Sequence, residues 1–420
     1  MISIDTVSGH KKKPISVVAI GAGNRMRTYM HYVEQHPDLV QLVAIVERDA
    51  IRRNAMATRF AITRQNIYKD YEDFFQRPVS ADAVLICTPD DEHYRPCMMA
   101  LERGYHVLLE KPIAQTIEQC EDIARVAQEK SLIVCVCHVM RYHPCFIKIK
   151  ELIDGGTLGR LISINHIERV GLDRATHSYV RGIWNRAETS NPMVLAKCCH
   201  DVDFLLWITK GRCRKISSFG GLRWFRQDNA PAGSAERCVH CQVEPSCPYS
   251  AVNLYLERHD WISNFDVPDG KTLDDVIRQE LKDGRLGRCV FHCDNNVVDQ
   301  QAVMMEMEDG VTISLSMDIF TQQDNRQISI RLTNGEIESD EQKVKVTYFR
   351  ERRQETFDFS GVISQPYHGG ADLKIMEEFV QAIRGSRHHL PSAISDSVES
   401  HRICFEAERS RLAGRTIELN

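Results

Sequence analysis

The stretch ISVVAIGAG, residues 15–23, decides the fold of the first part of this chain. Its first six residues are mostly apolar and rich in β-branched side chains, which favours a buried strand. Gly21-Ala22-Gly23 then favours a tight turn into a helix, where a dinucleotide pyrophosphate can rest on the helix N-terminus. Met26 replaces the third glycine of the usual fingerprint, so the motif is weak alone. The other reading is a glycine turn that binds no dinucleotide.

The surrounding sequence supports the dinucleotide interpretation. Helical patterns lie at 94–104 and 116–130, the second with Thr116 as a good N-cap. Strands are expected at 39–49, 81–89, 104–112 and 131–141. Strands that alternate with helices predict an α/β class fold, a doubly wound parallel sheet of the Rossmann type.

Glu47 closes the second expected strand, near the spacing at which a carboxylate accepts hydrogen bonds from the adenosine ribose. That carboxylate favours NAD over NADP, because it repels a 2′-phosphate. The neighbouring Arg48 is able to hold a phosphate, so NADP stays open as the second choice. The predicted cofactor contacts in these two turns are Gly21, Gly23, Asn24, Arg25, Met26, Glu47 and Arg48.

The composition excludes several classes of protein. The 420 residues are too many for one ordinary core and predict two domains. The net charge of -5 gives no reason to expect a nucleic acid or a membrane surface as partner. No apolar stretch approaches the roughly 18 residues that span a bilayer, and residues 1–14 lack the apolar core of a secretory signal. We therefore expect the 15 cysteines to be free thiols in the cytoplasm.

A more specific motif follows in DAVLICTPDDEHYRPCMMALERGYHVLLEKP, residues 82–112. Its elements are Thr88-Pro89, His93, Ala100-Leu101, Gly104 and Glu110-Lys111-Pro112. In these elements the chain closely resembles the Gfo/Idh/MocA family, the glucose–fructose oxidoreductase and inositol dehydrogenase group. The stretches at 155–164 and 368–383 match later parts of that family, so the resemblance covers nearly the whole chain.

The resemblance implies a dinucleotide-binding domain at 1–145 and a substrate and oligomerisation domain at 146–420. The second domain would be an α+β unit with an open-faced, mostly antiparallel sheet. The sequence supports this, since Asp309-Gly310 and Asn334-Gly335 are hairpin turn pairs between strand patterns. In the family an open sheet face is commonly a subunit interface, so the resemblance also implies a homodimer or homotetramer. Residues 225–290 exceed the family core and are interpreted as a loop-rich insertion, of the kind that covers sites or meets partners.

The resemblance also implies the chemistry, a hydride transfer between a nicotinamide and a secondary alcohol of a sugar, cyclitol or related carbohydrate. Lys111, which a cis bond to Pro112 would aim into the cleft, and His200 are the predicted acid/base and orienting groups, with Lys197 in support. The family usually carries an aspartate where this chain has Ala196, so the carboxylate role has no obvious owner. Thr88, Pro89, His93, Glu110 and Lys111 complete the implied cofactor contacts.

Further polar and aromatic residues are expected to face the substrate. Arg141 and His143 follow the last strand of the predicted parallel sheet, where ligands collect. Asp201 shares a helix face with Lys197 and His200 and is able to pair with either. The full set of predicted substrate contacts is Arg141, His143, Tyr179, Arg181, Trp184 and Asp201. Tyr179 and Trp184 have an equally good interpretation as core of the domain interface.

Cysteines gather in the insertion as Cys238, Cys241 and Cys247, with Cys289 and Cys293 near its end. Cys-x2-Cys is a zinc-knuckle spacing, but no second such pair follows. Cys198 and Cys199 lie about 100° apart on a helix and do not jointly face one ion. We therefore predict no metal site and leave a structural zinc in the insertion as the alternative.

Three other functions remain open at this stage. The first is a sugar-processing enzyme, a glycosidase or epimerase, that oxidises its substrate only transiently with retained NAD. The second is a non-catalytic ligand-binding regulator on the same fold, which the missing aspartate at Ala196 favours. The third is a zinc-dependent alcohol dehydrogenase, which requires three metal ligands with an open position.

Overall fold

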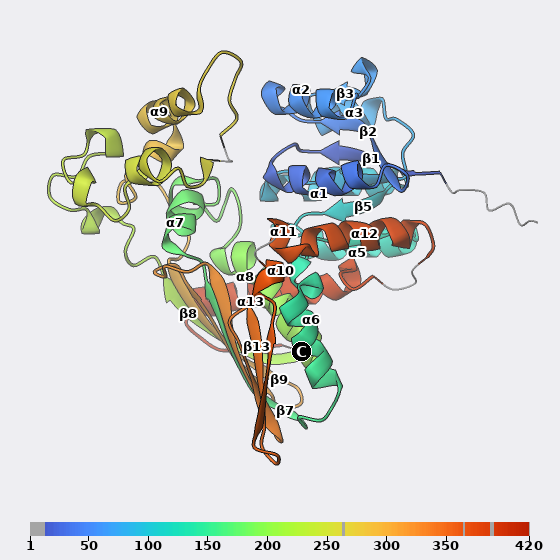
Figure 1. The fold of residues 1–420 in the computed structure, drawn as a ribbon, viewed down its shortest axis with the longest axis vertical. Coiled ribbons are helices and arrows are strands. Elements are labelled where there is room, and N and C mark those ends of the chain that lie inside the picture. Colours follow the sequence, from blue (N-terminus) through green and yellow to red (C-terminus); the bar gives the residue numbers. More distant parts are fainter. Residues whose placement is uncertain (1–12, 263–264, 364–365, 387–389, 420) are drawn as a thin grey trace, which may run out of the picture.

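The computed structural model describes residues 13–262, 265–363, 366–386 and 390–419. Figure 1 shows two sheets with their helices, one at each end of the molecule. The first sheet is parallel and sandwiched between helices, and the second is larger, with helices on one face only. This confirms the predicted fold class.

The N-terminal sheet has six strands in the order β3-β2-β1-β4-β5-β6, all parallel. Its strands are β1 (Ile15–Ile20), β2 (Val40–Val46), β3 (Ile67–Tyr68), β4 (Ala83–Ile86), β5 (His106–Leu109) and β6 (Val134–Val136). The helices are α1 (Asn24–Gln35), α2 (Ala50–Arg59), α3 (Tyr71–Gln76), α4 (Tyr94–Glu102) and α5 (Ile117–Glu129). Thr116 caps α5 by accepting a hydrogen bond from the Gln119 amide, as predicted.

The second sheet has nine strands in the order β14-β13-β12-β11-β7-β10-β9-β8-β15. They are β7 (Leu161–Arg169), β8 (Cys213–Gly221), β9 (Gln300–Met307), β10 (Thr312–Asp318), β11 (Asn325–Leu332), β12 (Gly335–Ser339), β13 (Lys343–Tyr348), β14 (Arg353–Asp358) and β15 (Ile417–Glu418). Only β7 and β10 pair in parallel among these described strands. Both predicted hairpins are present, as β9–β10 and β11–β12.

Helices cover one face of the second sheet and share its core (Figure 1). These are α6 (Pro144–Asp154), α8 (Met193–Thr209) and α13 (Ile394–Ala413). The short helices of this half are α7 (Leu172–Ala175), α10 (Ser360–Ile363) and α11 (Pro366–Gly369). The other face is open, and it exposes Phe219 on β8 and Met304 on β9.

One late segment returns to the first sheet. Helix α12 (Ala371–Ile383) packs against α1, and its Ile375, Met376 and Phe379 belong to the core under β1 and β2. The expected boundary at residue 145 assigned this helix to the second domain. The difference arises because the docking is a long-range contact with no signal in the local sequence pattern.

The insertion at 225–290 is more ordered than the sequence pattern indicates. It contains α9 (Leu273–Asp283), which begins with a capping box between Thr272 and Asp275. It also has a small core of its own, built around Tyr255, Ile277 and Leu281. In Figure 1 the insertion rises beside the first sheet, on the side of β2 and α2.

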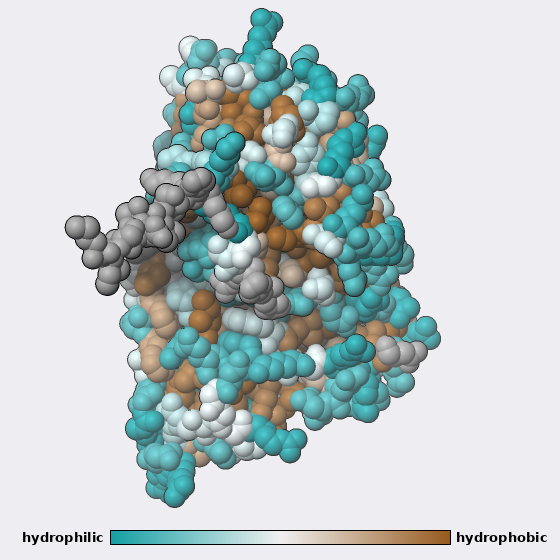
Figure 2. Space-filling view, turned by 90° about the vertical axis from the view of Figure 1, so that its right-hand side faces the viewer, coloured by the Kyte–Doolittle hydropathy of each residue, from teal (hydrophilic) through white to brown (hydrophobic). Residues whose placement is uncertain are grey.

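The surface in Figure 2 is a mixture, with hydrophobic areas broken up by hydrophilic side chains. Within the described ranges, no helix is both long and apolar enough to cross a membrane.

Candidate active site

A cavity of about 550 Å³ lies at the carboxyl edge of the parallel sheet, where β1, β2 and β4 end. Ligands collect at this edge in doubly wound sheets because the strand order reverses there. The opposite wall comes from the second domain, with Ser178 and Trp184 before α8 and Phe265 and Leu286 in the insertion. The cavity is therefore built by both domains.

The glycine turn fits a pyrophosphate. Gly21 has φ +88° and a Cβ there would lie 2.5 Å from the Cys87 carbonyl oxygen, so no other residue fits without strain. Gly23 has ordinary backbone angles, and a Cβ there would meet nothing within 4 Å. That space at the N-terminus of α1 is where a phosphate would lie. Met26 is fully buried in the core and does not line the cavity.

The ribose end of the cavity carries the predicted carboxylate. Glu47 Oε2 accepts a hydrogen bond from the Ala22 amide at 2.6 Å, and Oε1 accepts one from the Asp49 amide at 2.8 Å. Its side chain thus bridges the ends of β1 and β2. Arg48 forms an ion pair with Glu92, which removes the free guanidinium that a 2′-phosphate would require.

The Glu110-Lys111-Pro112 segment is held by buried ion pairs. Glu110 Oε1 accepts hydrogen bonds from Arg25 Nε and the Tyr29 hydroxyl, both at 2.6 Å. Arg25 also donates to Asp372 of α12 at 2.6 Å, so the late helix secures the turn. The Lys111–Pro112 bond is cis, as predicted.

His93 and Thr88 hold the neighbouring turn in place. The buried His93 ring lies between two backbone carbonyls, with Nδ1 2.6 Å from Pro112 O and Nε2 3.0 Å from Thr88 O. It therefore ties the Thr88-Pro89 turn to the Lys111-Pro112 turn. Thr88 and Pro89 line the cavity, whereas His93 does not.

Lys111 reaches across the domain boundary to α8. Its Nζ donates a hydrogen bond to the Ala196 carbonyl oxygen at 2.7 Å. Position 196 is the one where a carboxylate was missing, and its backbone oxygen supplies an acceptor for the ammonium instead. This contact brings Lys111 against helix α8, which also carries the second candidate, His200.

His200 lies one helical turn beyond Ala196, half-buried, with its Nδ1 buried and without a hydrogen-bond partner. Burial, the positive charge of Lys111 and the neighbouring His138 hold its pKa well below the usual histidine value. The imidazole is therefore neutral at physiological pH and able to accept a proton. The His138 ring lies 5.6 Å away, fully buried, with neither nitrogen hydrogen-bonded.

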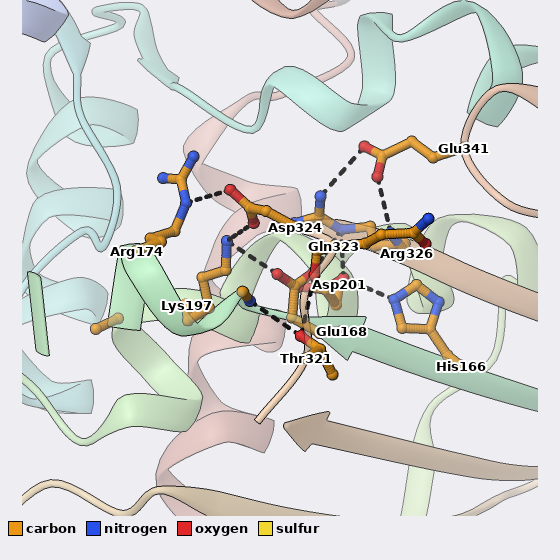
Figure 3. Close-up of polar contacts among 12 residues, drawn as sticks. His166, Glu168, Arg174, Lys197, Asp201, Thr321, Gln323, Asp324, Arg326 and Glu341 are labelled. Carbon is orange, nitrogen blue, oxygen red and sulfur yellow. Dashed lines mark hydrogen bonds and ion pairs between the residues drawn. The ribbon is translucent and has the colours of Figure 1, made fainter. Parts of the chain in front are cut away.

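Lys197 and Asp201 point into a second, largely buried group of charges (Figure 3). Lys197 Nζ lies 2.9 Å from Glu168 Oε1, and Arg326 Nε lies 2.9 Å from Glu168 Oε2 and 2.7 Å from Asp201 Oδ1. His166 Nε2 lies 2.6 Å from the same Asp201 oxygen. Burial raises the pKa of Glu168 to about 7, against the attraction of Arg326 and Lys197. Lys197 Nζ is thus held by two carboxylates, Glu168 and, at 3.6 Å, Asp324.

The remaining substrate candidates separate into two groups. Trp184 lines the cavity, and its Nε1 donates to Asp90 Oδ1 of the first domain at 2.9 Å, so it is wall and domain contact at once. Tyr179 is half-buried, with its ring 6.2 Å from Trp184. His143 is buried at the start of α6, with Nδ1 unpartnered. None of these three side chains brings a charge into the cavity.

Two arginines from that list make structural contacts and do not face the cavity. Arg141 donates to both carboxylate oxygens of the buried Asp203, at 2.7 and 2.9 Å. Arg181 is buried against the insertion, where it donates to the carbonyls of Arg288 and Tyr249. The sequence offered no means of seeing these partners, because they come from distant segments.

Several polar residues of the site were not identified from the sequence. Glu168 and Arg326 lie on strands β7 and β11, where a charged residue in an alternating pattern normally points to solvent. His138 follows β6, a strand that the sequence predicts. Its place at a strand end is the sequence signal by which it could have been identified as a site residue. His368 on α11 hydrogen-bonds Asp372 at 2.6 Å and extends the chain of polar contacts that begins at Glu110.

The cysteines of the insertion are free thiols. In the described part of the chain, no group of three or more Cys, His, Asp or Glu side chains is arranged to hold a metal ion. Cys238 Sγ instead accepts hydrogen bonds from the Ala251 amide at 3.5 Å and from Arg181 at 3.8 Å. Cys198 and Cys199 are both buried, the former in the apolar stripe of α8 as expected.

Residues 15–138 match the model of an oxidoreductase family with an NAD-binding Rossmann fold. A Bacillus subtilis oxidoreductase, YteT, is 24% identical over 65% of this chain and 63% of its own length. The 2,7-anhydro-N-acetylneuraminate hydratase of Mediterraneibacter gnavus is 26% identical over 37% of this chain and 40% of that protein. The chain thus matches less than two thirds of the length of either relative.

A solved structure extends the likeness to both domains. The WlbA dehydrogenase of Bordetella pertussis, in complex with NADH and UDP-GlcNAcA, has a TM-score of 0.70 and 16% identity. The superposition covers 98% of this chain and 99% of that one. The two chains therefore share their whole fold, including the second sheet.

Proposed function

We propose that this chain, whose residues 15–138 match the NAD-binding model of the Gfo/Idh/MocA oxidoreductase family, transfers a hydride between a nicotinamide and a secondary alcohol of a carbohydrate-like substrate. The observation that carries the proposal is the contact of Lys111 with the Ala196 carbonyl at 2.7 Å. It brings the cofactor side of the cleft and the histidine-bearing helix α8 together at one point.

NAD fits the residues that line the cavity. The space beside Gly23 at the start of α1 suits the pyrophosphate, and the carboxylate of Glu47 suits the ribose hydroxyls. When bound, the nicotinamide supplies the hydride chemistry itself. The task left to the chain is to orient the alcohol, remove its proton and stabilise the negative charge that develops on its oxygen.

His200 and Lys111 suit those tasks. The His200 imidazole has a buried Nδ1 without a hydrogen-bond partner and, with its pKa lowered by burial, is unprotonated and can accept the alcohol proton as a weak base. The Lys111 ammonium places a positive charge beside it, where it stabilises a developing alkoxide. Lys197 lies on α8, as His200 does, and its ammonium is fixed by Glu168. Its proposed role is to position a substrate hydroxyl.

A second candidate is an enzyme that oxidises its substrate only transiently and returns the hydride. Two observations favour it. The insertion lines one side of the cavity. One relative is named as a hydratase, and a hydration involves no net oxidation. In that case product forms while no reduced nicotinamide accumulates. Steady accumulation of NADH with a sugar or cyclitol favours the simple dehydrogenase.

The test is a panel of sugars, inositols and glycosides, assayed with NAD for both product and NADH. Lys111→Ala and His200→Ala should each lower the turnover number by about a hundredfold or more, because each removes an acid/base or charge-stabilising group. Lys374→Ala on the exposed face of α12 and His240→Ala in the insertion serve as matched controls. Unchanged turnover in both active-site variants would sink the catalytic interpretation and favour a ligand-binding regulator.

A further inference from the structure

Two arginines line the cavity beside Glu47, at the ribose end. Arg48 follows Glu47 directly, and Arg52 stands on the first turn of α2. A free guanidinium at this place is what recognises the 2′-phosphate of NADP. What these two side chains contact therefore bears on the choice of nucleotide.

Both arginines are already paired with carboxylates. Arg48 is held by Glu92 from the turn after β4. Arg52 Nε donates to Asp266 Oδ2 at 2.5 Å, and Arg27 of α1 donates to the other oxygen, Oδ1, of the same carboxylate. Asp266 thus binds one guanidinium on each oxygen. It belongs to the insertion, whereas both arginines belong to the dinucleotide-binding domain.

The charge of Asp266 is secure at neutral pH. Burial raises the pKa of its carboxyl, but the hydrogen bonds from Arg27 and Arg52 outweigh that effect and lower it below the usual aspartate value. The side chain is only 18% exposed, so solvent screens the pairing weakly. A phosphate that approached Arg52 would have to displace Asp266 and lie close to the negative charge of Glu47.

We propose that Asp266 is a cofactor-specificity residue, supplied by the insertion, which selects NAD over NADP by occupying Arg52 and Arg27. The inference rests on the proposed function, since it takes this cavity to be the dinucleotide site. It extends that function by assigning nucleotide choice to a segment outside the Rossmann domain.

The position of the insertion supports a role at the ligand. Phe265, Glu280, Arg285 and Leu286 line the same cavity, so the Asp266 contact lies at its rim. A contact that only fastened the insertion to the domain would change thermal stability without changing the preference between the two nucleotides. The ratio of the two affinities therefore separates specificity from a structural role.

The experiment measures the dissociation constants of NAD and NADP by calorimetry on protein freed of copurified nucleotide. Asp266→Asn should improve the affinity for NADP relative to NAD by about tenfold, because Arg52 becomes available for a charge-assisted contact. Adding Arg52→Ala to that variant should abolish the gain. Asp269→Asn removes an exposed carboxylate from the same loop and should leave the ratio unchanged.

An unchanged NADP-to-NAD ratio in Asp266→Asn, with NAD still bound, would overturn the inference and leave the proposed function intact. If that variant is unstable, Asp266→Ser with the same measurement decides, because it also removes the charge. A wild-type protein that binds neither nucleotide would overturn the proposed function and this inference with it.

Discussion

At the scale of single residues, burial shifts the pKa values of two groups in the candidate site, His200 and Glu168. Burial and the positive charge of Lys111 lower the pKa of the half-buried His200, and burial raises the pKa of Glu168 to about 7. Lys111 Nζ donates to the backbone oxygen of Ala196. In the function proposed above, a backbone oxygen therefore stands at position 196, where the resemblance implies a carboxylate.

Buried histidines should also make stability depend on pH, and His143 is the clearest case. Burial lowers the pKa of His143 to about 4, with Arg326 and His368 adding to the effect and Glu341 opposing it. A histidine with a depressed pKa takes up its proton in the unfolded chain first. Its contribution to stability is therefore complete above about pH 6.5 and is lost as the pH falls towards 4, by roughly 3 kcal/mol.

His143→Gln should accordingly reduce the slope of the unfolding free energy between pH 6.5 and 4, measured by denaturant titration. His240→Gln, an exposed histidine of the insertion, should leave that slope as it is in the wild type. Equal slopes for His143→Gln and the wild type would show that His143 does not titrate in this way.

At the scale of elements, the turn between β1 and α1 assigns different roles to its two glycines. Gly21 is required by the fold, because a Cβ would collide with the Cys87 carbonyl at the end of β4. Gly23 is not required by the fold, since the space around its missing Cβ is open. That space has a purpose only if a ligand fills it.

Gly23→Ala should therefore keep the melting temperature within a few degrees of the wild type and weaken NAD binding by about tenfold or more, measured by calorimetry. Gly21→Ala is the contrasting variant, and strain with steric overlap should destabilise it by several kcal/mol. Undiminished NAD binding in Gly23→Ala would place the pyrophosphate elsewhere.

Local pattern predicted the elements well but not their docking. The strand runs, the cap at Thr116 and both hairpin turns depend on neighbours in sequence, and the structure confirms them. The return of α12 to the first sheet and the pairing of Glu168 with Lys197 depend on contacts between distant segments. Arg141 and Arg181 were predicted to contact the substrate from their places at a strand end and in a motif. Their partners, Asp203 and the Arg288 carbonyl, also come from distant segments.

At the scale of the whole molecule, the second sheet leaves one broad face uncovered. Phe219 is 68% and Met304 49% exposed there, on the adjacent strands β8 and β9. Phe219 pairs with Ala302, two residues from Met304, so both side chains point to the same face. Exposed apolar side chains on an open face favour association with a second copy.

The chain should therefore run as a dimer or tetramer in light scattering coupled to size exclusion. The double variant Phe219→Ser, Met304→Ser should shift the population to a smaller species, because it removes apolar contact area while leaving the buried face intact. Leu412→Ser, an exposed apolar residue on α13, is the matched control. A monomeric wild type would contradict the homo-oligomer.

The central claim is that NAD in this cavity exchanges a hydride with a carbohydrate-like alcohol, through Lys111 and His200. Its most direct test is the absorbance of reduced nicotinamide in a single turnover, after mixing the protein–NAD complex with members of the substrate panel. The absorbance change detects both net and transient oxidation of the substrate. We predict a signal with at least one member, slowed about a hundredfold or more in Lys111→Ala and in His200→Ala. Binding of panel members with no signal from any of them, or a signal that is equally fast in both variants, would contradict the account.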